Sequence, residues 1–141
     1  MVEYSARCHC GVLTARYSTQ KPPVEWPVRA CQCSFCRAHG ALSTSDPVGR
    51  LQFGCSRPEL LQRYRFATGT AEFFLCRECG VYLGAQMSSG GARFGILNIL
   101  TFNPVPADLR SPEAMNYGGE AAESRRARRA TRWTPLVRES I

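Results

Sequence analysis

The chain has 141 residues, 44% of them hydrophobic and 21% charged, which is the usual composition of one globular domain with a single core. Its longest apolar run, around residues 94–102, is far shorter than the roughly 20 residues that a membrane span needs, and the opening MVEYSARC has no apolar signal segment, so we expect a cytoplasmic protein with no membrane contact. The net charge of +7 comes almost entirely from arginine, and Lys21 is the only lysine.

Alternating and β-branched stretches predict many short strands separated by turns. A tight helical turn is expected at residues 34–39, ended by Gly40, and the SRPE sequence at 56–59 has the pattern of a capping box before a second turn. The strands are expected at residues 13–17, 28–30, 48–53, 63–66, 71–75 and 93–100. This pattern predicts a mainly β domain.

Turn and polar residues dominate after residue 110, so we place a domain at 1–110 and a partly ordered, arginine-rich extension at 111–141. Five arginines cluster between residues 125 and 132, with only Trp133 as an aromatic neighbour. This segment is more typical of a solvated tail or an exposed helix than of a nucleic-acid reader, although an arginine tail that binds nucleic acid remains an alternative.

Eight cysteines are many for a cytoplasmic chain, where disulfides do not persist and cysteine clusters more often bind metal or act in catalysis. Two pairs, in CHCG and CRECG, each end in a glycine, which tolerates the positive φ of a metal-binding turn. Together they provide the four thiolates of a closed tetrahedral zinc site. The predicted ligands of this structural zinc are Cys8, Cys10, Cys76 and Cys79.

The sequence CQCSFC holds a third cluster, Cys31, Cys33 and Cys36. Three protein ligands with a fourth position left for water or substrate are typical of a catalytic zinc, which can be labile. Cys55 or His39 would close the site and make it structural instead.

The stretches CHCG, CQCSFCR, YRFATGTAEFFLCRECG and FGILNIL together resemble the glutathione-dependent formaldehyde-activating enzyme family, which includes centromere protein V. The resemblance runs from about Cys8 to Leu100 and implies a β-tent fold of short antiparallel sheets around zinc. It implies the same division of the cysteines, with the trio binding a catalytic zinc. Many family members have a histidine at the position that Phe73 occupies here.

A zinc bound by three thiolates suits the binding of a fourth thiolate better than the making of hydroxide. We therefore expect a carbon–sulfur lyase or thiol–aldehyde adduct-forming enzyme, acting on a small glutathione-like thiol and an aldehyde. Arg37 is a candidate for binding a substrate carboxylate, and a pocket lined by Phe35, Phe73 and Tyr82 is expected. The alternative is a non-catalytic binding module with two structural zincs; a homodimer is also possible under either interpretation.

Overall fold

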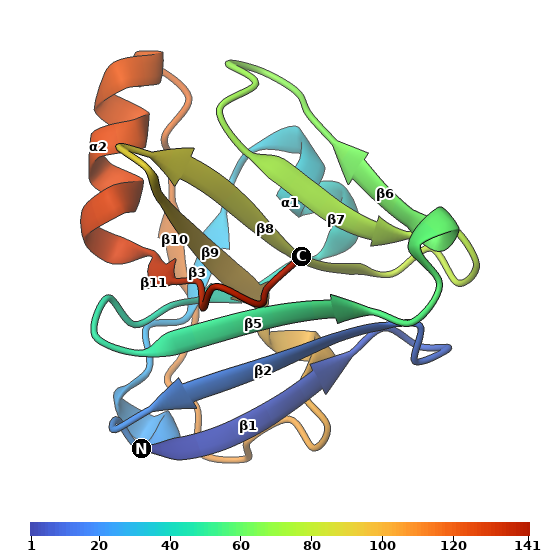
Figure 1. The fold of residues 1–141 in the computed structure, drawn as a ribbon. Coiled ribbons are helices and arrows are strands. Elements are labelled where there is room, and N and C mark those ends of the chain that lie inside the picture. Colours follow the sequence, from blue (N-terminus) through green and yellow to red (C-terminus); the bar gives the residue numbers. More distant parts are fainter.

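The computed structural model describes residues 1–141 and confirms the mainly β class with short antiparallel sheets (Figure 1). No helix is long and apolar enough to cross a membrane. The strands are β1 (Val2–Arg7), β2 (Leu13–Thr19), β3 (Arg29–Cys31), β4 (Ser43–Thr44), β5 (Arg50–Cys55), β6 (Leu61–Tyr64), β7 (Glu72–Cys76), β8 (Tyr82–Ser89), β9 (Ala92–Asn98), β10 (Glu113–Met115) and β11 (Thr134–Pro135). The α-helices are α1 (Ser34–His39) and α2 (Ala122–Arg132), and 3₁₀ turns lie at Pro23–Glu25, Pro58–Leu60 and Ile99–Thr101.

The strands form two sheets. The smaller has the order β1-β2-β5, and all of its pairs are antiparallel. The larger has the order β10-β3-β4-β9-β8-β7-β6, with β11 also paired to β9, and only its β10–β3 pair is parallel. Isolated bridges from Ala6 to Phe102 and from Leu51 to Leu136 join the smaller sheet to other segments of the chain.

Two hydrophobic clusters lie between these elements. The larger fills the space between the sheets around fully buried Trp26, whose ring meets Tyr4, Tyr17 and Phe102. The Trp26 indole N–H donates to the Lys21 carbonyl at 2.9 Å, so the one polar atom of this buried side chain has a hydrogen-bond partner. The smaller cluster lies beside α1 and α2 and includes Phe73, Tyr82 and Trp133.

The segment after residue 110 contributes β10, α2 and β11, and two of these elements join the larger sheet. The chain end is held by backbone hydrogen bonds from Val137 to Leu51 and from Ile141 to Phe53. Arg93 donates to the carbonyls of Val137, Arg138, Ser140 and Ile141. Because both ends of α2 connect to paired strands, the position of this helix relative to the sheet is fixed.

One local prediction is wrong in detail. The SRPE sequence does begin a helical turn, at Pro58–Leu60, but Arg57 occupies the N-cap position and no side chain caps the turn. Glu59 instead accepts a hydrogen bond from the Arg57 guanidinium. Since a single 3₁₀ turn leaves few backbone donors to satisfy, the capping box is not needed here.

Candidate functional site

The cysteines of CHCG and CRECG form two matching turns. Gly11 and Gly80 have φ of 85° and 79°, so each turn has the left-handed residue that its closing glycine predicted. Their amides donate to the carbonyls of Cys8 and Cys76 at 3.1 and 2.8 Å. The first turn connects β1 to β2 in the smaller sheet, and the second connects β7 to β8 in the larger one.

These two turns bring four sulfurs together. The ligand atoms of Cys8, Cys10, Cys76 and Cys79 all lie within 4.8 Å of one another. The Cys8–Cys10 and Cys10–Cys76 sulfur distances are 3.7 and 3.6 Å. A tetrahedron with Zn–S bonds of about 2.3 Å has sulfur–sulfur edges of about 3.8 Å, so the spacing fits zinc and is too long for a disulfide.

Backbone amides point at these sulfurs, as they do in metal-binding turns. Leu13 donates to the Cys8 sulfur at 3.2 Å, and Cys79 donates to the Cys76 sulfur at 3.5 Å. Burial raises the pKa of the Cys8 thiol to about 12. A nearby cation is therefore needed to hold this buried sulfur as a thiolate at neutral pH.

The remaining trio is assembled by β3 and α1. Cys31 ends β3, Cys33 is the N-cap residue of α1, and Cys36 lies buried in the first turn of that helix. The three sulfurs lie within 4.8 Å of one another, and the Cys33 sulfur accepts a hydrogen bond from the Cys36 amide at 3.4 Å. Gly40, with φ of 58°, ends α1 as predicted.

Without a cation the trio does not ionise as three thiolates. A hydrogen bond from Cys36 lowers the pKa of Cys31 to about 5, and the same bond raises the pKa of Cys36, which burial raises further. One sulfur is thus held as a thiol because its neighbour is a thiolate. A divalent cation at the centre removes this conflict, which is the chemistry expected of a zinc ligand set.

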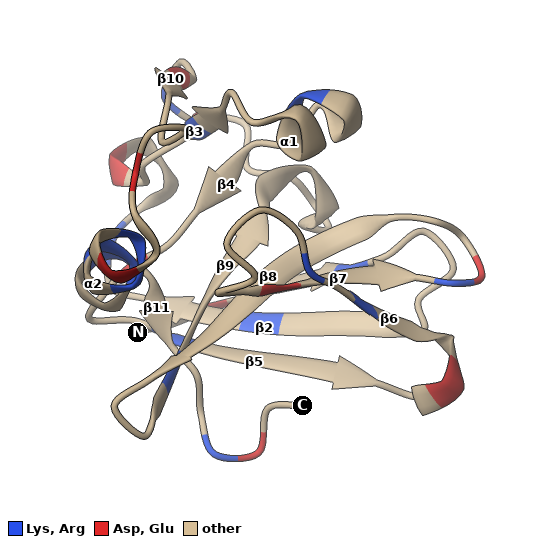
Figure 2. Cartoon of the chain, turned by 90° about the horizontal axis from the view of Figure 1, so that it is seen from above, with Lys and Arg blue, Asp and Glu red and all other residues tan.

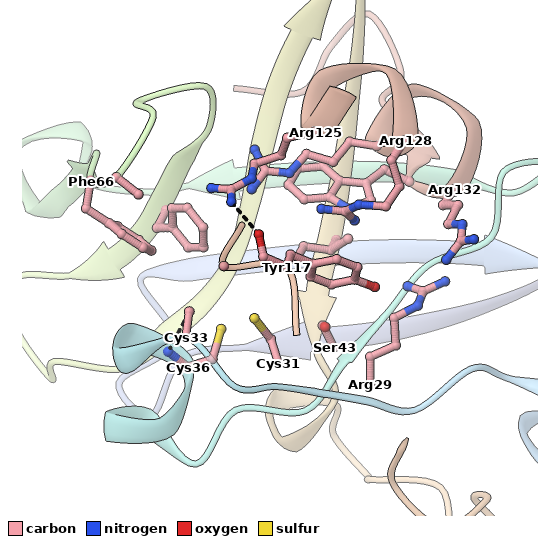
Figure 3. Close-up of a pocket in the computed structure, with 16 residues that line it drawn as sticks. Arg29, Cys31, Cys33, Cys36, Ser43, Phe66, Tyr117, Arg125, Arg128 and Arg132 are labelled. Carbon is pink, nitrogen blue, oxygen red and sulfur yellow. Dashed lines mark hydrogen bonds between the residues drawn. The ribbon is translucent and has the colours of Figure 1, made fainter. Parts of the chain in front are cut away.

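The trio lies at one side of a cavity of about 190 Å³ (Figure 3). Apolar walls come from Phe66, Phe73, Ile96 and Trp133. Phe73 therefore lines the cavity, as predicted. Phe35 and Tyr82 pack against Phe73 with ring centroids 5.0 and 5.9 Å away and support this wall from behind.

The opposite side of the cavity is cationic. Figure 2 shows basic residues gathered on α2, and four of them line the cavity together with one from β3. These residues are Arg29, Arg125, Arg128, Arg129 and Arg132. The α2 segment expected to be solvated therefore has one face turned inward, and the Arg129 residue is only 9% exposed.

Hydrogen bonds fix several of these arginines. Arg129 donates to the Thr70 hydroxyl at 2.8 Å, and Arg125 donates to the Tyr117 carbonyl at 2.8 Å. The Arg128 guanidinium lies 3.6 Å from the centre of the Tyr117 ring. It also donates two hydrogen bonds of 2.9 Å to Glu120.

The Tyr82 hydroxyl is a buried donor beside the trio. It has no hydrogen-bond partner in the protein. Burial raises its pKa well above the ordinary value, and the charges of Cys36, Cys33 and Cys31 raise it further. Tyr82 therefore stays protonated at neutral pH, as a neutral donor close to the sulfurs.

Three sequence candidates lie outside this arrangement. Arg37 is exposed and does not line the cavity. Cys55 donates to the Arg57 carbonyl, and His39 packs on the Phe35 ring at a centroid distance of 4.5 Å. Neither belongs to a group of side chains that could hold a metal, so the trio offers three candidate ligands among cysteine, histidine and carboxylate side chains.

A family profile for the glutathione-dependent formaldehyde-activating enzyme matches residues 3–117. The chain belongs to this family. A crystal structure of a Rhodobacter sphaeroides protein, solved as a structural-genomics target, is 28% identical and superimposes with a TM-score of 0.61 over 79% of this chain and 99% of its own. No curated protein is significantly similar to the chain. The family match ends before α2, which supplies most of the cationic wall.

Glu120 precedes α2 and pairs with Arg125 and Arg128 of that helix, so we expect Glu120→Gln to lower the free energy of unfolding by about 1–2 kcal/mol at pH 7. Hydrogen bonds from Arg128 lower the pKa of this carboxyl, which is 18% exposed. The stabilisation is thus fully present above the ordinary pKa of 4.5 and is lost only as the pH falls through the lower folded value. Urea unfolding at pH 6, 7 and 8 should give a constant difference.

Glu3→Gln is the control for this prediction, because Glu3 is exposed and forms no ion pair. It should change the free energy of unfolding by less than about 0.5 kcal/mol. Equal losses in the two variants would show that the Glu120 ion pairs do not stabilise the fold.

Proposed function

We propose that this protein is a zinc-dependent enzyme that forms or cleaves the carbon–sulfur bond between a small-molecule thiol and an aldehyde. Membership of the glutathione-dependent formaldehyde-activating family supports the reaction class. The observation that carries the proposal is the position of the trio: three sulfurs open to a cavity, with no fourth protein ligand beside them. A binding module with two closed zinc sites would need such a ligand.

Two roles follow for the cysteine clusters. Cys8, Cys10, Cys76 and Cys79 would hold a structural zinc, since their sulfurs saturate a tetrahedron and join the two sheets. Cys31, Cys33 and Cys36 would hold the second zinc, which when bound supplies the positive charge that keeps a fourth, substrate sulfur in its thiolate form.

The chain's own side chains would orient the reactants. The apolar wall of Phe66, Phe73 and Trp133 excludes water from the thiol and the aldehyde carbon. Tyr82 packs against Phe73 behind this wall and holds its ring in place. In the forward direction the sulfur–carbon bond forms, the carbonyl π bond breaks onto oxygen, and the proton lost by the thiol ends on that oxygen. Cleavage is the reverse, so no oxidant or reductant is needed.

Zinc per chain is the first test. Freshly purified, reduced protein should contain two zincs, and dialysis against a mild chelator should lower the value to one, because a site with one open position exchanges its metal more readily than a closed one. Elemental analysis before and after dialysis measures this. Two zincs that both survive would show that the trio is closed and would overturn the proposal.

An activity assay then separates the reaction from metal binding. Protein reloaded with zinc should accelerate adduct formation between a thiol and formaldehyde, and the protein with one zinc should not. Loss of the second zinc without any change in rate would show that the trio is a metal site with another role.

A further inference from the structure

The cavity has far more positive than negative charge. Five guanidinium groups line it, and no aspartate or glutamate does. Glu120, outside the lining, pairs with Arg125 and Arg128, while Arg29, Arg129 and Arg132 have no carboxylate within 4.0 Å. Three thiolates and one Zn²⁺ leave a single negative charge, so the metal site by itself does not neutralise this wall.

Two buried polar atoms at the wall have no partner. The Tyr117 hydroxyl is buried without a hydrogen bond. Nε of Arg129 also has no partner, and this residue is only 9% exposed. Unsatisfied donors of this kind are rare in folded proteins because each loses its hydrogen bonds to water. Figure 3 shows the Tyr117 hydroxyl directed toward the guanidinium groups of Arg29 and Arg132.

The environment of Arg29 also favours an anion. Its guanidinium donates one hydrogen bond, to the Ser45 hydroxyl at 2.9 Å, which leaves other donors free. Arg128 and Arg132 line the same cavity as Arg29, so like charges face one another there. An acidic group between these side chains would relieve that repulsion.

We propose that Tyr117, Arg29 and Arg132 form a subsite that binds an acidic group of the substrate, a carboxylate or a phosphate. This inference rests on the proposed function for the identity of the substrate, but the anion subsite itself does not. Arg132 comes from α2, outside the family match at residues 3–117, so this part of the specificity belongs to the chain's own C-terminal segment.

The strand geometry places Arg29 and the trio on one side of the cavity. Arg29 and Cys31 are two residues apart on β3, so their side chains leave the same face, with Cα atoms about 7 Å apart. One small substrate can therefore place its sulfur at the trio and an acidic group beside Arg29. The substrate class is therefore a compact acidic thiol rather than a neutral one.

Inorganic phosphate is the first probe, titrated calorimetrically into the zinc-loaded protein at low ionic strength. We expect saturable binding that Arg132→Gln weakens about tenfold, since a hydrogen bond between charged groups is lost. Tyr117→Phe should weaken binding at least about threefold without lowering the melting temperature, because the hydroxyl that it removes has no partner in the protein.

Arg126→Gln is the matched control. Arg126 lies on the same helix, is exposed and does not line the cavity, so its removal changes the net charge equally. It should leave phosphate affinity within about twofold of the parent protein. No phosphate binding, or equal weakening by Arg126→Gln and Arg132→Gln, would overturn the proposal.

A pair of thiols of equal length tests the substrate class. 3-Mercaptopropionate should bind the zinc-loaded protein more tightly than 3-mercaptopropan-1-ol, and Arg132→Gln should abolish this preference. Phosphate binding without any thiol–aldehyde activity would refute the proposed function and leave the anion subsite standing. Equal affinity for the two thiols would refute the assignment of the substrate as an acid.

Discussion

A Cys76→Ser protein is expected to lose one zinc and most of its folded structure. The Cys76 sulfur is buried and lies 3.6 Å from that of Cys10, so it closes the contact between the smaller and the larger sheet. Structural zinc sites in small peptides contribute roughly 10–16 kcal/mol, which is as large as the whole stability of an ordinary domain of roughly 5–15 kcal/mol. Near-ultraviolet circular dichroism and zinc per chain measure the two losses.

Cys55→Ser provides the control for this prediction. Cys55 is half-buried on β5, belongs to neither metal-ligand group and donates only to the Arg57 carbonyl. A serine hydroxyl can make the same hydrogen bond, so we expect both zincs to remain and the free energy of unfolding to change by less than about 1 kcal/mol. If Cys76→Ser melted within a few degrees of the parent protein, the four-cysteine site would not be what stabilises the fold.

The two cysteine clusters were predictable because their signals are local. A glycine after a cysteine pair specifies the positive φ of the turn, as Gly11 and Gly80 show. The division of seven cysteines into a group of four and a group of three followed from spacing alone, and the structure brings those same groups together. Gly40 ended the α1 turn for a similar local reason.

The cationic wall was not predicted because α2 carries no apolar stripe. Its sequence, AESRRARRATR, has alanine as its only apolar residue and was therefore expected to be solvated, yet the four inward arginines recur at helical spacing. These positions, 125, 128, 129 and 132, follow the i, i+3, i+4, i+7 pattern of one helix face. Asking which face the arginines share would have found the wall.

Sheet partners also lie beyond local reasoning. β10 pairs in parallel with β3 across more than 80 positions of the chain, and such a contact leaves no mark on either segment alone. Position in the sequence also did not predict which arginine lines the cavity, as Arg37 shows. It directly follows a ligand in sequence, but α1 turns it to the surface while Arg29, two residues before the trio begins, lines the cavity.

A Cys36→Ser protein should stay folded, contain one zinc and lose at least about a hundredfold in the rate of thiol–aldehyde adduct formation. A free thiol with a pKa of about 8.5 is only a few per cent thiolate at pH 7, so losing the cation alone lowers the reactive fraction about thirtyfold. Losing the fixed position of the sulfur lowers the rate further. Zinc content, melting temperature and initial rates on one preparation separate these effects.

Cys36 is buried, so its replacement can also disturb the packing around Phe73 and Tyr82. Cys31→Ser resolves this, because Cys31 is half-buried at the end of β3 and should give the same zinc loss with a smaller change in melting temperature. Agreement between the two variants assigns the rate loss to the metal site. If either variant retained two zincs and the parent rate, the trio would not be the reacting centre, and the cavity would have to bind its acidic ligand for another purpose.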